Sequence, residues 1–100
     1  MLTREEILAR KTGRGKAILP DGGEVEVRGL TRDEVLKSQE MKDTGEKDTF
    51  IIATGMVNPK LSVQDVQTWA ATANAGDLVA VSDRIAELSG LTQDAAKSGV

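Results

Sequence analysis

The spacing of apolar and polar residues along this chain predicts several short helices around one strongly apolar segment. That segment covers residues 50–57 (Phe-Ile-Ile-Ala-Thr-Gly-Met-Val) and is followed by Asn58-Pro59. A segment that is apolar on nearly all sides is typical of a buried element, although eight such residues are also compatible with a strand. Acidic residues precede it and Pro follows it, which are helix start and stop signals. We therefore predict a buried central helix over 50–57.

Three other helix starts share one pattern, in which Leu is followed by Thr or Ser, two variable residues, an acid, and Ile or Val. The pattern begins at Leu2, Leu30 and Leu61. In such a capping box, the cap hydroxyl and the acid each accept a hydrogen bond from a backbone N–H at the helix start. We predict a short helix after residue 3, a second that ends near residue 42, and a third over 62–74. The unlike sequences between these starts favour three independent caps over an internal repeat.

Residues 16–28 have the pattern of a β-hairpin. Pro20-Asp21-Gly22-Gly23 is a turn sequence, and the following residues alternate, with Val25 and Val27 on one face and charged residues on the other. A two-stranded ribbon is only marginally stable by itself. The face with the two valines is therefore expected to cover the helices or a partner.

The last helical pattern has Asp77 as its predicted cap and Ser89-Gly90 as its end. Its apolar residues recur on one face and form a narrow seam, which consists of Leu78, Val81, Ile85 and Leu88. The seam fits either the inner face of a helical bundle or a stripe that binds a partner or a second copy. The only tryptophan, Trp69, lies one helix earlier among alanines and likewise suits a core position or an interface.

The amino-acid composition excludes several classes of function for this protein. One hundred residues form one domain, and with 2% aromatic residues its core must be built from aliphatic side chains. A net charge of −3 argues against general nucleic-acid binding. Cys and His are both absent, which excludes disulfides, thiolate metal sites and the commonest general base. We expect no cofactor, no metal site and no catalytic residues, in a protein that is neither secreted nor membrane-spanning.

Two charged patterns resemble functional motifs, but each has a simpler explanation. Residues 12–17 (Thr-Gly-Arg-Gly-Lys-Ala) resemble the end of a phosphate-binding loop, yet they lack its first glycine and its hydroxyl residue. We interpret them as part of a flexible basic loop. The acidic pairs at the helix starts are explained by the favourable interaction of negative charge with a helix N-terminus.

Together these patterns predict a mainly α protein, a small helical domain of four to five helices with an N-terminal β-hairpin. We expect one domain over 1–91 and a mobile tail over 92–100, which has no bulky residue before Val100. The predicted core consists of Phe50, Ile51, Ile52, Val57, Leu61 and Val66. The candidate partner-binding residues are Trp69, Leu78, Val81, Ile85 and Leu88.

The second half of the chain resembles the tail assembly chaperones of long-tailed bacteriophages. The similarity lies in Val57-Asn58-Pro59-Lys60-Leu61-Ser62, in Ala75-Gly76-Asp77-Leu78, and in the ending Ile85-Ala86-Glu87-Leu88-Ser89-Gly90-Leu91. With the hairpin and the Leu-Thr-x-x-Glu helix start before them, the resemblance covers residues 15–91. The basic N-terminal segment and Trp69 are not part of the family pattern.

This resemblance implies a non-enzymatic protein that coats the long, helical tape-measure protein and keeps it soluble while tail-tube subunits polymerise around it. It implies the tape-measure protein as a partner, the tail-tube protein and a longer frameshift product as further candidates, and weak self-association. The expected location is the host cytoplasm rather than the mature virion, without nucleic-acid or membrane partners. Trp69 and the seam would then bind tape-measure helices or neighbouring copies, while residues 50–57 hold the domain together.

Two other classes of function remain open. One is a structural head–tail connector or tail completion protein of a phage. The other is a small helix-turn-helix regulator with its helices at 62–74 and 78–89. The second of these helices carries Arg84 as its only base, together with several acids that oppose DNA.

Overall fold

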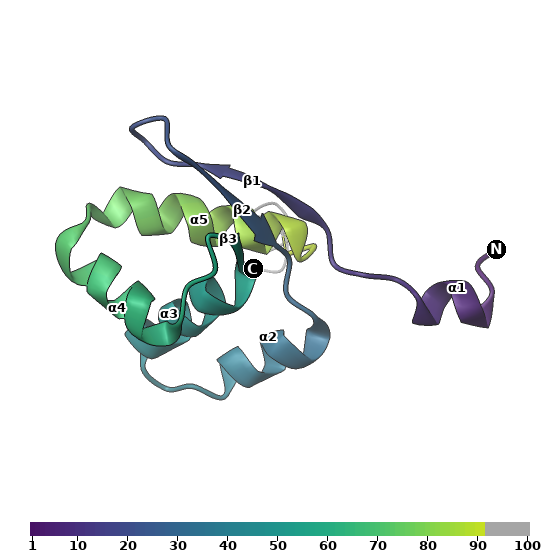
Figure 1. Cartoon of the computed structure of the whole chain (residues 1–100). Helices are drawn as coiled ribbons and strands as arrows, with labels where there is room; N and C mark the ends of the chain where they lie inside the picture. The colour runs from purple at the N-terminus through teal and green to yellow at the C-terminus, as the bar shows by residue number, and fades with distance from the viewer. Residues whose placement is uncertain (92–100) are drawn as a thin grey trace.

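Helix α5 lies between a small antiparallel sheet and the other helices of the domain (Figure 1). The computed structural model describes residues 1–91, which form the helices α1 (Arg4–Leu8), α2 (Arg32–Gln39), α3 (Thr44–Gly55), α4 (Val63–Thr72) and α5 (Ala75–Leu88), and the strands β1 (Arg14–Ile18), β2 (Glu24–Arg28) and β3 (Met56–Asn58). This architecture confirms the predicted fold class, which was mainly α with an N-terminal hairpin. The predicted mobile tail over 92–100 lies outside the described residues.

All three predicted capping boxes form. Thr3, Thr31 and Ser62 each accept a hydrogen bond from the backbone N–H of the acid three residues later, whose carboxylate accepts from the N–H of the cap. Each helix start is therefore encoded locally, by residues that are close in sequence. α2 ends at Gln39, slightly earlier than predicted.

Helix α5 begins earlier than the sequence indicated. Its N-cap is Asn74, which has an extended backbone, so Asp77 lies in the first turn and the prediction of Asp77 as the cap is wrong. In the first turn, Asp77 still benefits from the positive end of the helix dipole. The other end is as predicted, because Gly90 adopts φ 83° and the N–H groups of Gly90 and Leu91 donate to backbone carbonyls of the last turn.

The hairpin forms, and its strands pair from Arg14 opposite Arg28 to Ile18 opposite Glu24. β1 begins at Arg14, so part of the segment interpreted as a flexible loop is a strand instead. The strand forms because the backbone N–H and C=O groups of β1 pair with those of β2, whereas in a loop they would hydrogen-bond to water.

The apolar run over 50–57 is divided between two elements, so the predicted helix is correct up to residue 55 and wrong for residues 56 and 57. α3 begins at Thr44, with Asp43 as its N-cap, and ends at Gly55, while residues 56–58 form β3. The cause is tertiary, because β3 satisfies the backbone groups on the second edge of β2. At the junction, a Cβ on Gly55 would lie 2.5 Å from Cδ1 of Ile85, so the absence of a side chain allows α3 to approach α5.

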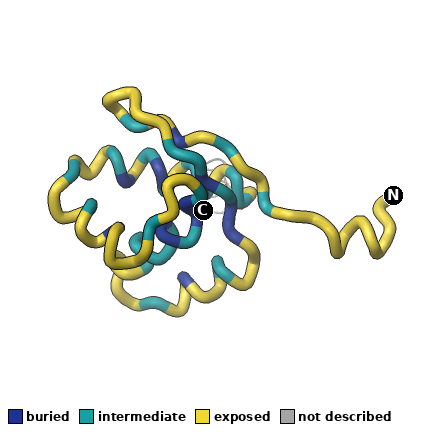
Figure 2. Tube along the Cα trace, in the orientation of Figure 1, coloured by how far each residue is buried: buried dark blue, intermediate teal, exposed yellow. Residues whose placement is uncertain are grey.

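The core lies where the sheet, α3 and α5 meet (Figure 2). Its buried apolar members are Ala17, Val27, Leu30, Ile52, Ala53, Met56, Val66, Leu78, Val81 and Ile85. The six residues that the sequence predicted for the core divide into three pairs: Ile52 and Val66 are fully buried, Ile51 and Leu61 are half-buried against the core, and Phe50 and Val57 are half-buried outside that cluster.

An ion pair fastens α2 to the sheet. Arg28, at the end of β2, donates one hydrogen bond of 2.9 Å to each carboxylate oxygen of Glu34. Both side chains are about a quarter exposed, so water screens the pair only in part. The guanidinium of Arg28, and then the backbone N–H of Thr31, hold the pKa of Glu34 at about 2, well below its usual 4.5.

Replacing Glu34 with Gln should therefore lower the free energy of unfolding at neutral pH by about 2 kcal/mol. Gln preserves the shape of the capping box, so the loss reports the charge. Because the pKa of Glu34 is lower in the folded state, its stabilisation is complete above pH 4.5 and is lost as the pH falls toward 2. Urea unfolding of both proteins over this range should show the difference shrinking. Asp33→Asn is the matched control, since Asp33 is exposed, and a pH-independent difference for Glu34→Gln would contradict the prediction.

Candidate functional site

The structure places most of the predicted partner-binding residues in the core. Leu78, Val81 and Ile85 are at most 8% exposed, and their face of α5 packs against the sheet and α3. A partner could touch these three side chains only if the domain opened. Trp69 and Leu88 are half-buried and pack against the same core.

The only base on α5, Arg84, contacts the hairpin. Its Nε donates a 3.0 Å hydrogen bond to the carbonyl oxygen of Lys16, and another guanidinium nitrogen lies 3.5 Å from Glu87. Its guanidinium also lies over Gly15, where a Cβ would come within 2.6 Å of it. The second helix of the suggested helix-turn-helix therefore has no base directed outward for DNA.

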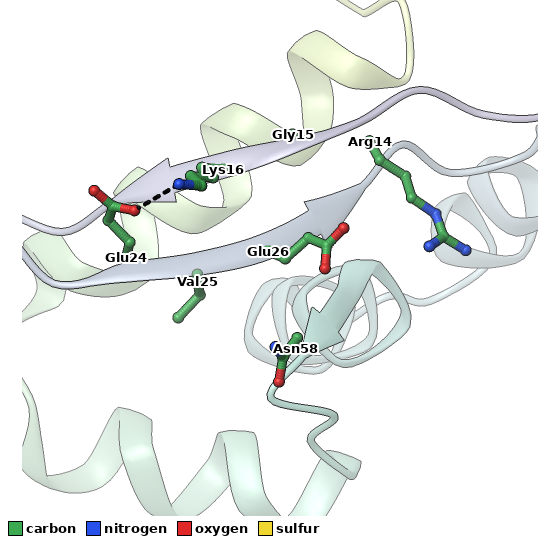
Figure 3. Close-up of a pocket in the computed structure, with 7 residues that line it drawn as sticks. All are labelled: Arg14, Gly15, Lys16, Glu24, Val25, Glu26 and Asn58. Atoms are coloured by element: carbon green, nitrogen blue, oxygen red, sulfur yellow. Dashed lines mark ion pairs between the residues drawn. The ribbon is translucent and has the colours of Figure 1, made fainter.

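Two hollows beside the sheet are lined mainly by charged side chains. One, of about 450 Å³, spans β1 and β2, with Asn58 of β3 at its side (Figure 3). Lys16 and Glu24 are turned toward each other there at 3.1 Å, whereas Arg14 is turned away from them. Both members of this pair are more than half exposed, so it contributes little stability. The other hollow, of about 900 Å³, is basic and is lined by Arg10, Lys11, Thr12, Arg14, Arg28, Thr31 and Glu34.

A smaller, more apolar hollow of about 240 Å³ lies between α3 and α4. Its lining residues define the α3–α4 hollow: Met41, Glu46, Thr49, Phe50, Val63 and Gln67. Val63 is 47% exposed and Phe50 is half-buried, with the Nζ of Lys37 5.7 Å from the centre of its ring. An apolar hollow with polar groups at its edge, built on two helices, suits a side chain from a partner helix.

The sequence analysis did not find this hollow. Phe50 was predicted for the core, and Val63 was not among the candidate partner-binding residues. The spacing within α4 could not reveal it, because Val63 and Val66 are three residues apart and share a helix face, yet Val66 is fully buried and Val63 is 47% exposed.

A fourth hollow, of about 510 Å³, lies between α2 and the end of α5. Its lining residues define the α2–α5 hollow: Leu30, Arg32, Val35, Leu36, Gln39, Ser89 and Leu91. Leu36 and Leu91 are 42% and 52% exposed. Helix α1 also exposes apolar side chains, Ile7 and Leu8; none of its residues is buried, and it stands away from the domain (Figures 1 and 2).

Within residues 1–91, no group of three or more His, Cys, Asp or Glu side chains is placed to hold a metal ion. None of the helices in that range has the length and apolar character needed to cross a membrane.

Comparison of the chain with protein-family models, curated proteins and solved structures found no match. The similarity to phage tail assembly chaperones therefore rests on the residues and motifs of this chain alone.

Proposed function

We propose that this protein is a non-enzymatic tail assembly chaperone of a long-tailed bacteriophage. It binds the helical tape-measure protein in the host cytoplasm, keeps it soluble while the tail tube forms, and is absent from the finished particle. The resemblance over residues 15–91 supports the family, and the small helical domain offers surfaces suited to binding rather than to catalysis.

The observation that carries the proposal is the α3–α4 hollow. Long helical proteins expose apolar side chains at i, i+3, i+4 and i+7 when they lack their assembly partners, and such stripes cause aggregation. A hollow between two helices can receive one of these side chains, with Phe50 and Val63 supplying the apolar contact. Glu46, Thr49 and Gln67 also line the hollow and supply polar groups beside the apolar contact.

With the binding site in the α3–α4 hollow, Trp69 and the seam on α5, which the sequence suggested for binding, have other roles. The seam on α5 is buried, so it shapes the domain that presents the hollow. Trp69 is half-buried on α4 and packs against the core, where it supports the helix that carries Val63.

Co-expression with the tape-measure protein tests the proposal. We expect the wild-type protein to raise the soluble fraction of the tape-measure protein, and Val63→Asp to abolish most of that gain. Removing one buried valine contact weakens binding roughly tenfold. Asp is tolerated at this first helical position because the helix dipole favours negative charge there.

The matched control is Val79→Asp, which places the same change at a 54% exposed valine on α5 that does not line the hollow. It should protect the tape-measure protein as well as wild type does. A tape-measure protein that is equally insoluble with and without the wild-type protein would refute the chaperone function. Recovery of this protein from purified virions would favour the structural connector instead.

A further inference from the structure

Helix α1 is too short to be stable without a partner. It spans five residues, from Arg4 to Leu8, and none of them is buried. Isolated helices shorter than about 12–15 residues are marginal in water even with good sequences, because helix nucleation is costly. The capping box of Thr3 and Glu6 aids the start of the helix but contributes no apolar contact. A stable α1 therefore requires a surface against which its apolar side chains can pack.

Residues 1–8 expose four large apolar side chains: Met1, which is fully exposed, and Leu2, Ile7 and Leu8, which are 48%, 54% and 68% exposed. Residues 10–12 connect α1 to a fixed point, since the carbonyl oxygen of Gly13 accepts a 2.9 Å hydrogen bond from the N–H of Gly29. The segment is thus an arm that is anchored at the sheet and directed outward (Figure 1).

The same chain carries a surface that matches this arm. The α2–α5 hollow, of about 510 Å³, has exposed leucines at Leu36 and Leu91 and a base at Arg32. Arg32 is in no ion pair among residues 1–91, and neither is Glu5 of α1. Both surfaces carry exposed leucines, and the carboxylate of Glu5 can pair with the guanidinium of Arg32 across a contact between them.

We propose that α1 of one copy docks in the α2–α5 hollow of a second copy. Leu8 and Ile7 enter beside Leu36, and Glu5 lies near Arg32. The second copy is the occupant because the arm carries α1 outward from its own domain, and because both halves of the contact are present on every copy.

Sedimentation velocity on the full-length protein alone, over a hundredfold dilution series, tests this contact. We expect the average mass to rise above that of the monomer with concentration. Leu8→Asp and Leu36→Asp should each raise the dissociation constant roughly tenfold to a hundredfold, since each removes one leucine from a small apolar interface. Neither change touches the buried core, and Val79→Asp should leave self-association unchanged. A protein that stays monomeric throughout, or one whose association ignores Leu8→Asp, would overturn the proposal.

Cysteine cross-linking identifies which copy receives the arm, because the natural chain has no Cys. A Leu8→Cys chain mixed with a Leu36→Cys chain should form a disulfide-linked heterodimer on mild oxidation, and Val79→Cys in place of Leu36→Cys should not. A doubly substituted chain that closes on itself in dilute solution would show that α1 folds onto its own domain, against the proposal. These measurements use no tape-measure protein, so their failure and the failure of the proposed function are distinguishable.

Discussion

Replacing Ile85 with Asp is expected to unfold the domain. The Ile85 side chain is fully buried between α3 and the sheet, and no base lies in the surrounding core cluster. Placing a carboxylate there costs several kcal/mol or more, which is comparable to the total stability of a small domain. Far-UV circular dichroism should show loss of helix, and urea titration should show no cooperative transition.

Two controls separate this effect from a change at a surface. Ile85→Val removes one methylene and should cost about 1 kcal/mol while the fold persists. Val79→Asp, on the same helix but 54% exposed, should keep both the helical signal and the transition. If Ile85→Asp kept the fold and lost only association, the seam would be an interface and the core described here would be wrong.

Gly29→Ala should be the most disruptive of the single-methyl substitutions in the sheet region. A Cβ at Gly29 would meet the carbonyl group of Leu88 and would lie 2.7 Å from the backbone nitrogen of Ser89. These are backbone atoms of the last turn of α5, so β2 and α5 would have to move apart. The movement would also stretch the 2.7 Å hydrogen bond from the Leu30 N–H to the Ser89 hydroxyl. We expect a loss of about 2–4 kcal/mol in the free energy of unfolding.

Gly13→Ala provides the matched control for this substitution. Gly13 is hydrogen-bonded directly to Gly29, but a Cβ there would lie 3.6 Å from the nearest Leu88 atom, which is an ordinary contact. Chemical unfolding should therefore place Gly13→Ala within about 0.5 kcal/mol of wild type. Equal losses for the two variants would mean that flexibility of the glycines, rather than the close approach to α5, sets the cost.

The burial of Ile85 also changes how binding is explained in this protein. A row of apolar residues on one helix face can either pack in the core of a domain or bind a partner. In this domain, Leu78, Val81 and Ile85 pack in the core. In the proposals made above, binding uses apolar side chains outside the core, in the α3–α4 hollow and on α1. Both are reachable without unfolding, so each can be altered by substitutions that leave the domain intact.

Local features of this protein followed from the sequence by itself. The three capping boxes, the hairpin turn and the glycine cap at Gly90 depend on residues within a few positions of one another. Periodicity also identified α5 and its apolar face, and with the caps it predicted the fold class. These features were predictable because the interactions that produce them are short-range.

Tertiary structure alone decided which apolar residues became core, strand or surface. Residues 56–58 left the helical pattern because β2 offered backbone partners, and Gly55 allowed α3 to reach α5. Leu78, Val81 and Ile85 were buried because the sheet and α3 covered them, whereas Val63 and Leu36 stayed exposed because no element among residues 1–91 covers them. The physical reason is common to all of these residues: hydrophobicity sets the gain from burial, but the position of distant elements decides which side chains can obtain it.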